Sequence, residues 1–272
     1  MLDKPVGVGD AAPVADAAKA RGRTSQKALG KLTETVDGTL RIASQPPLLV
    51  PLRALAHDAD PDALRQQIRD SFTDYADTLL PDRTHLLHRF ELVDMALKVV
   101  GVGSVGTRCL IVLLESDTGS PLFLQFKEAT ASVLEPYLGA SEFEEAGERV
   151  VRGQRLMQAT GDIFLGWSRY HRPDGLEVDF YFRQLWDGKG SADVDRMGPK
   201  RLKNYAGHCG GALALAHART GDAATISGYL GDDNTIDHVL ADFAERYADV
   251  AEHDHAAHLD AIATGRIRVP ES

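Results

Sequence analysis

Hydrophobic and polar residues alternate clearly over residues 122–127, LFLQFK, where positions 122, 124 and 126 share one face and Lys127 lies on the other. A period of two predicts a strand. The apolar run at residues 109–114, CLIVLL, predicts a neighbouring strand that is buried on both faces. A turn cluster at residues 117–121, DTGSP, separates the two runs, so the pattern predicts a hairpin.

Further periodic stretches extend this hairpin into a sheet. Strands are predicted over residues 92–102, 108–115, 122–127, 163–170 and 178–186. The last two are joined by a turn at residues 173–175, PDG. A helical pattern covers residues 141–160, and Ser141 with Glu144 resembles a capping box. We therefore expect an α+β fold in which one mostly antiparallel sheet carries this helix on one face.

Other segments show the period of amphipathic helices. They are residues 24–36, 60–79, 201–220 and 235–264. Pro81 is expected to end the second of them. A glycine-containing break at residues 187–191 suggests a boundary between lobes. The expected organisation is a partly irregular extension at 1–60, a helix-plus-sheet domain at 61–191 and a helical part at 192–272.

Between the strands at 92–102 and 108–115, the glycines Gly101, Gly103 and Gly106 have the spacing GxGxxG. A Rossmann nucleotide site needs a helix to open at about Gly106. The chain instead continues as a predicted strand, which favours the glycine-rich hairpin that covers nucleotide in the small lobe of a protein kinase. Lys127, on the next strand, would then meet the phosphates. A plain glycine-rich hairpin with an exposed lysine is the competing interpretation.

This order of elements predicts a set of nucleotide-binding residues. They are Gly101, Gly103, Ser104, Gly106, Lys127, Glu135, Glu148, Arg183 and Gln184. Glu135 or Glu148 would orient the lysine, and Arg183 and Gln184 lie where a hinge would contact a base. The two glutamates, Arg183 and Gln184 could equally be solvated surface residues or members of ion pairs, with no role in binding.

No catalytic or metal-binding residue is assigned. His253, Asp254, His255 and His258 lie close in sequence, but on a helix only Asp254 and His258 share a face. There is no GxSxG motif either, so hydrolase chemistry has little support.

Composition narrows the classes of protein. The 272 residues carry a net charge of −10, which argues against broad binding of nucleic acid or an anionic membrane. No apolar run approaches the ~20 residues of a membrane span, and the start of the chain does not resemble a signal peptide. Cys109 and Cys209 form no disulfide framework, so reduced thiols and a cytoplasmic location are expected.

Several longer motifs resemble a bacterial family, the domain of unknown function 2252 family. The resemblance covers roughly residues 24–268 and includes VVGVGSVGTR, LFLQFKEA, SVLEPYLG, FYFRQLWDGKGS and YAGHCGGALALAHARTGD. It implies a longer protein, in which GD-x-H-x-x-N-like and D-F-D-like segments precede the glycine loop, as in a circularly permuted kinase. This sequence contains neither segment, so it resembles the C-terminal portion of such a protein.

The resemblance therefore implies a truncated or split kinase-like protein, or a degenerate copy of one. Phosphoryl transfer needs a base-positioning aspartate and Mg²⁺ ligands as well as a glycine loop and a lysine. We expect ATP with Mg²⁺ as the cofactor, a separate polypeptide carrying the missing half as partner, and no activity from this chain alone. A non-catalytic scaffold protein is the alternative function, and a Rossmann-type oxidoreductase is a weaker one.

Overall fold

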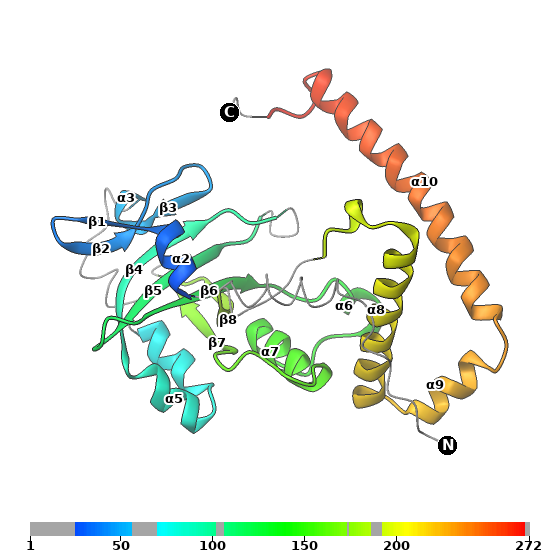
Figure 1. The fold of residues 1–272 in the computed structure, drawn as a ribbon, viewed down its shortest axis with the longest axis horizontal. Helices are drawn as coiled ribbons and strands as arrows, with labels where there is room; N and C mark the ends of the chain where they lie inside the picture. Colours follow the sequence, from blue (N-terminus) through cyan, green and yellow to red (C-terminus); the bar gives the residue numbers. More distant parts are fainter. Residues whose placement is uncertain (1–24, 56–69, 102–105, 173, 186–191, 270–272) are drawn as a thin grey trace. The chain divides into compact units, whose positions relative to one another are not determined.

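A computed structural model describes residues 25–55, 70–101, 106–172, 174–185 and 192–269. The chain divides into two compact units, residues 1–216 and 217–272, and each is described by itself. The first unit combines helices with antiparallel sheets, so the predicted α+β class is confirmed (Figure 1).

A six-stranded sheet forms the centre of the first unit. In spatial order its strands are β3 (Leu49–Pro51), β4 (Phe90–Lys98), β5 (Cys109–Ser116), β6 (Pro121–Ala129), β8 (Glu177–Gln184) and β7 (Gly166–His171). Every neighbouring pair is antiparallel, as predicted. The Rossmann alternative is wrong, because it requires a parallel sheet and a helix opening at Gly106, where the chain instead enters β5.

The sheet has two faces, named here by the helices that cover them. The α7 face is covered by α7 (Ala146–Met157) and carries Ile111, Leu113 and Phe123. Helix α2 (Ser25–Leu32) packs on this face through Ala28 and Leu32. The opposite α5 face has its own core, which joins the sheet to the helical residues 70–77 and to α5 (Pro81–Leu87). Alternate residues of β5 and β6 therefore lie in different cores, which explains why the middle of both strands is buried on both faces.

Aromatic packing holds the helical residues 70–77 against the α5 face. The ring of Tyr75 stacks on that of Phe182, with centroids 4.0 Å apart, and its hydroxyl donates a hydrogen bond of 2.7 Å to the carbonyl of Phe164. The helical residues 70–77 belong to the predicted helix 60–79, and residues 60–69 of that prediction fall outside the described residues. The helix ends at Asp77, two residues earlier than predicted, and Pro81 begins α5, which the sequence did not predict.

Helix α7 (Ala146–Met157) lies against β7 and β8 (Figure 1). It begins five residues later than predicted, because the Ser141 hydroxyl accepts a hydrogen bond from the amide of Phe143 instead of capping a helix. The cap comes from β8, where the Asp179 carboxylate accepts a 2.7 Å hydrogen bond from the amide of Ala146. The helix start is thus fixed by a distant residue.

Near the N-terminus, the predicted helix 24–36 ends early. Helix α2 stops at Leu32, and the chain continues into a hairpin of β1 (Thr33–Val36) and β2 (Thr39–Ile42). Asp37 and Gly38 form the turn of this hairpin, with positive φ angles of 52° and 77°. Two such residues in a row suit the twist of a two-residue hairpin, which explains why strands replace the helix here. Helix α3 (Leu52–Leu55) follows β3.

The remaining helices are α6 (Glu135–Leu138), α8 (Pro199–Thr220), α9 (Ala223–Leu230) and α10 (Thr235–Ala263). The predicted helices 201–220 and 235–264 correspond to α8 and α10, whereas α9 was not predicted. Asp222 caps α9 by accepting hydrogen bonds from two main-chain amides. None of the described helices is both long and apolar enough to cross a membrane.

Candidate functional site

Lys127 lies in a row of side chains that crosses the α7 face. Residues directly opposite one another in an antiparallel pair share a face. Lys127 is opposite Cys109 on β5 and Tyr181 on β8, and Tyr181 is in turn opposite Trp167 on β7. Helix α7 packs over the Trp167 end of this row, because Gly147 of that helix lies against the Trp167 side chain. The lysine is therefore on the same face as the helix, as predicted.

A hydrogen-bonded chain runs beside this row across three strands. The Gln125 amide is 3% exposed and donates a 3.2 Å hydrogen bond to the Cys109 sulfur. Its oxygen accepts two hydrogen bonds from the Arg183 guanidinium, at 3.1 and 2.9 Å. Since buried polar groups need partners, these bonds hold Arg183 on the α7 face.

Three cations act electrostatically on the Cys109 thiol. Burial raises the pKa of this thiol, whereas Lys127, Lys98 and Arg183 each act to lower it. Burial of Tyr181 also raises the pKa of its phenol, again against the opposing effect of Arg183. We call Lys98, Lys127 and Arg183 the cationic cluster. It is a local concentration of positive charge in a chain whose net charge is −10.

The glycine loop joins the two strands that carry Lys98 and Cys109. Gly101 and Gly106 are described, whereas Gly103 and Ser104 lie outside the described residues. Gly106 has a φ of 82°, a conformation that favours glycine. A Cβ added at Gly101 or Gly106 would have no neighbour within 4 Å, so the backbone is open to approach at both ends of the loop.

The two glutamates predicted to orient Lys127 have other partners. The Glu135 carboxylate accepts a 2.9 Å hydrogen bond from the amide of Ser132. Glu148 forms a 3.1 Å ion pair with Arg152, one turn further along α7. Within the described residues, no carboxylate forms an ion pair with Lys127. The structure therefore does not bring the lysine together with either glutamate.

Arg183 and Gln184 lie on opposite faces of the sheet. Successive strand residues point to opposite faces, and Arg183 is paired with Gln125 whereas Gln184 is paired with Leu124 of the α5 core. Only Arg183 therefore shares a face with Lys127. Lys98, Gln125 and Tyr181 were not predicted as site residues. Their place beside Lys127 follows from the register of the paired strands.

The described residues contain no group of three or more His, Cys, Asp or Glu side chains placed to hold a metal ion. The histidine-rich stretch 253–258 lies in α10 and is exposed. Phosphate recognition at the cationic cluster would therefore rest on lysine, arginine and main-chain amides.

Comparison with known proteins gives one significant match. A family model described as "Uncharacterized protein conserved in bacteria (DUF2252)" matches residues 12–261. No curated protein and no solved structure matches the chain significantly. The match covers most of the sequence and comes with no described activity.

Proposed function

Since the chain belongs to the uncharacterised bacterial DUF2252 family, whose description names no activity, we propose a function from the site itself: the α7 face binds the phosphates of a nucleotide. The observation that carries this proposal is the cationic cluster at the base of the glycine loop. Three cations from three strands each act on the Cys109 thiol there, and no carboxylate forms an ion pair with Lys127 in the described part of the chain.

The arrangement supports a kinase-like small lobe. In protein kinases, ATP is held by a hairpin with a glycine loop, a lysine on the strand that follows the hairpin, and a helix packed on the same face. Here β4 and β5 form the hairpin, Lys127 lies on β6, and α7 packs on the same face of the sheet. Backbone amides near glycine can approach phosphate closely, because no Cβ stands in the way. Lys127 and Lys98 would neutralise charge on the phosphates, and Arg183, fixed by Gln125, would offer its remaining donors.

The proposal is limited to binding. Phosphoryl transfer also needs a base-positioning aspartate and metal ligands, and we assign neither to the described residues. Because the phosphate charge would be only partly neutralised, we expect weak affinity, with a Kd of roughly 0.1–1 mM.

Titration calorimetry with ATP tests the proposal, with and without Mg²⁺. Lys127→Ala should weaken binding at least about tenfold, which is what a lost charge-assisted hydrogen bond costs. The control is Lys203→Ala, which removes an exposed lysine from α8 and should bind as the parent does. Equal binding by the parent and Lys127→Ala would remove Lys127 from the site. Absence of binding at millimolar ATP would overturn the proposal.

A second candidate function is a non-catalytic interaction protein. Large apolar side chains on the C-terminal helices are more than half exposed. In the second unit they include Tyr229, Leu240, Phe243 and Tyr247. Exposed apolar side chains in such numbers are typical of a surface that another polypeptide covers. Sedimentation analysis tests this candidate, and a monodisperse monomer that also binds ATP would favour the nucleotide proposal over it.

A further inference from the structure

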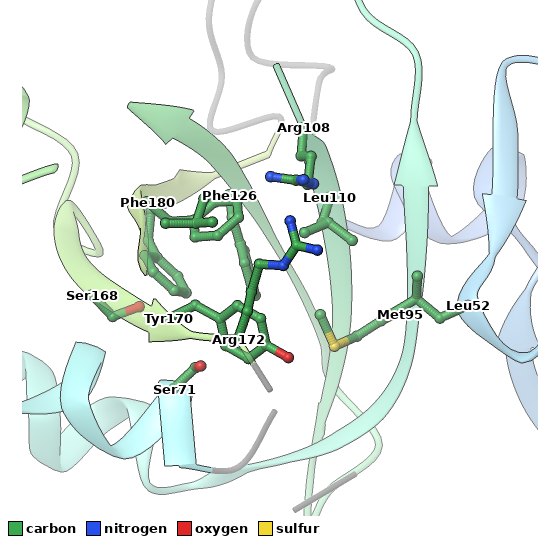
Figure 2. Close-up of a pocket in the computed structure, with 12 residues that line it drawn as sticks. Leu52, Ser71, Met95, Arg108, Leu110, Phe126, Ser168, Tyr170, Arg172 and Phe180 are labelled. Carbon is green, nitrogen blue, oxygen red and sulfur yellow. The ribbon is translucent and has the colours of Figure 1, made fainter. Parts of the chain in front are cut away.

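A cavity opens on the α5 face of the sheet, opposite Lys127 (Figure 2). Its volume is about 320 Å³, and side chains from all five strands β4 to β8 line it. Small-molecule sites in proteins span roughly 300–1,000 Å³. Register separates this cavity from the cationic cluster, because adjacent residues of β6 face opposite sides of the sheet. The nucleotide proposal therefore does not account for it.

The cavity walls are mostly apolar. They include Met95, Leu110, Phe126, Tyr170 and Phe180. The rings of Phe126 and Phe180 meet edge to face, with centroids 6.4 Å apart, and both residues are almost fully buried. This packing fixes the wall, so an apolar group entering the cavity would bury its surface without rearranging the core.

One polar atom in the cavity is unpaired. Ser168 is 3% exposed, and its hydroxyl has no hydrogen-bond partner among the described residues. The hydroxyl lies in the cavity lining in Figure 2, on β7 beside Phe180 of β8. A buried hydroxyl without a partner is destabilising, so an unpaired one beside a cavity indicates that something else supplies the partner.

Two arginines mark the open end of the cavity. Arg108 and Arg172 both line it, and their side chains are 49% and 34% exposed. Arg108 pairs with Glu128 at 3.2 Å, and Arg172 pairs with Asp174 at 2.6 Å. A guanidinium has five N–H donors, so each arginine keeps donors for an oxyanion after its ion pair is made.

We propose that this cavity binds a small amphipathic acid. The apolar body would lie against the wall formed by Phe126 and Phe180, a polar atom along it would pair with the Ser168 hydroxyl, and its carboxylate or phosphate end would meet Arg108 and Arg172. The planar guanidinium of arginine can donate two parallel hydrogen bonds to a carboxylate or to a phosphate. The class of ligand is therefore defined by one apolar end and one oxyanion end.

The test uses the full chain and three probes with ten carbon atoms each: decanoate and decyl phosphate below their critical micelle concentrations, and decanol below its solubility limit. Calorimetry should show saturable binding of decanoate, of decyl phosphate, or of both, and the difference between them identifies the oxyanion. Decanol should bind at least about tenfold more weakly than the better acid. Decanol binding as tightly as both acids would overturn the proposal, as would the absence of binding by all three probes.

Variants locate the binding. Arg108→Gln and Arg172→Gln should each weaken acid binding at least about tenfold, whereas Arg196→Gln, an 86% exposed arginine, should leave it unchanged. Leu110→Trp should block the cavity and abolish binding, and its retained ATP binding would show that the sheet is intact. Ser168→Ala should weaken binding while raising the thermal stability of the free protein. Unchanged acid affinity in both glutamine variants would overturn the proposal, even if Leu110→Trp fails to fold.

Discussion

Replacing Gly147 with alanine tests how closely α7 packs on the sheet. A Cβ at this position would lie 2.4 Å from the carbonyl oxygen of Phe180 and 3.1 Å from the Cβ of Trp167. The first contact is with backbone, so it cannot be relieved by rotating a side chain. Helix α7 would have to move away from β8, although the amide of its first residue is bonded to Asp179 on that strand.

The magnitude follows from two opposing effects. Alanine is favoured over glycine in a helix by up to about 1 kcal/mol. Inserting a methyl group into a well-packed contact costs about 1–3 kcal/mol, and contact with backbone places this position at the upper end. We therefore expect Gly147→Ala to lower the free energy of unfolding by about 2 kcal/mol.

The matched control is Gly153→Ala in the same helix. A Cβ there would meet only the Met157 methyl group, at 3.9 Å, so the variant should be stabilised by about 0.5–1 kcal/mol. Urea unfolding followed by tryptophan fluorescence measures both, because Trp167 lies against α7. A Gly147→Ala protein as stable as Gly153→Ala would refute the reasoning.

Three further predictions concern single side chains. Tyr75→Phe should cost about 1–2 kcal/mol by unpairing a buried carbonyl. Because burial raises the pKa of Tyr75, the folded parent keeps the phenol proton to a higher pH than the unfolded chain does, so between pH 9 and 11 the parent should lose more stability than the variant in urea melts. Asp179→Ala should cost about 3 kcal/mol, since the carboxylate caps α7 and pairs with Arg169 at 2.7 Å; an unchanged urea midpoint would contradict this. In a thiol titration, the exposed Cys209 should react rapidly. Cys109 should react only on unfolding, because it is buried and burial raises the pKa of its thiol; the Cys209→Ser variant, compared with the parent, isolates this slow reaction.

Local patterns in the sequence predicted most of the sheet. The run 109–114 and the alternation at 122–127 gave β5 and β6 with their antiparallel pairing, because burial on one or both faces leaves a direct periodic trace. The start of α7 was misplaced for the opposite reason. Its cap, Asp179, follows 33 residues later in the chain, so no local pattern around Ser141 could reveal it.

The candidate site was only partly predictable. Lys127 and Arg183 were recognised by their place in the order of strands, and the structure puts both on the α7 face. Gln184 was predicted beside Arg183, but a strand turns neighbouring side chains to opposite faces. Lys98 was not predicted, because its proximity to Lys127 depends on the register of β4 against β5.

The alternation of β6 limits which changes in chain length this protein can accept. Phe126 belongs to the α5 core and the next residue, Lys127, to the opposite face, so a deletion of one residue earlier in the strand would move Lys127 into the position of Phe126 and Phe126 onto the α7 face. An ammonium group would then enter an aromatic core and a phenyl ring would leave it. The turn at residues 117–120, which is exposed, can absorb an extra residue without this exchange. During divergence, gained or lost codons should therefore accumulate in the turn and be eliminated from the strand.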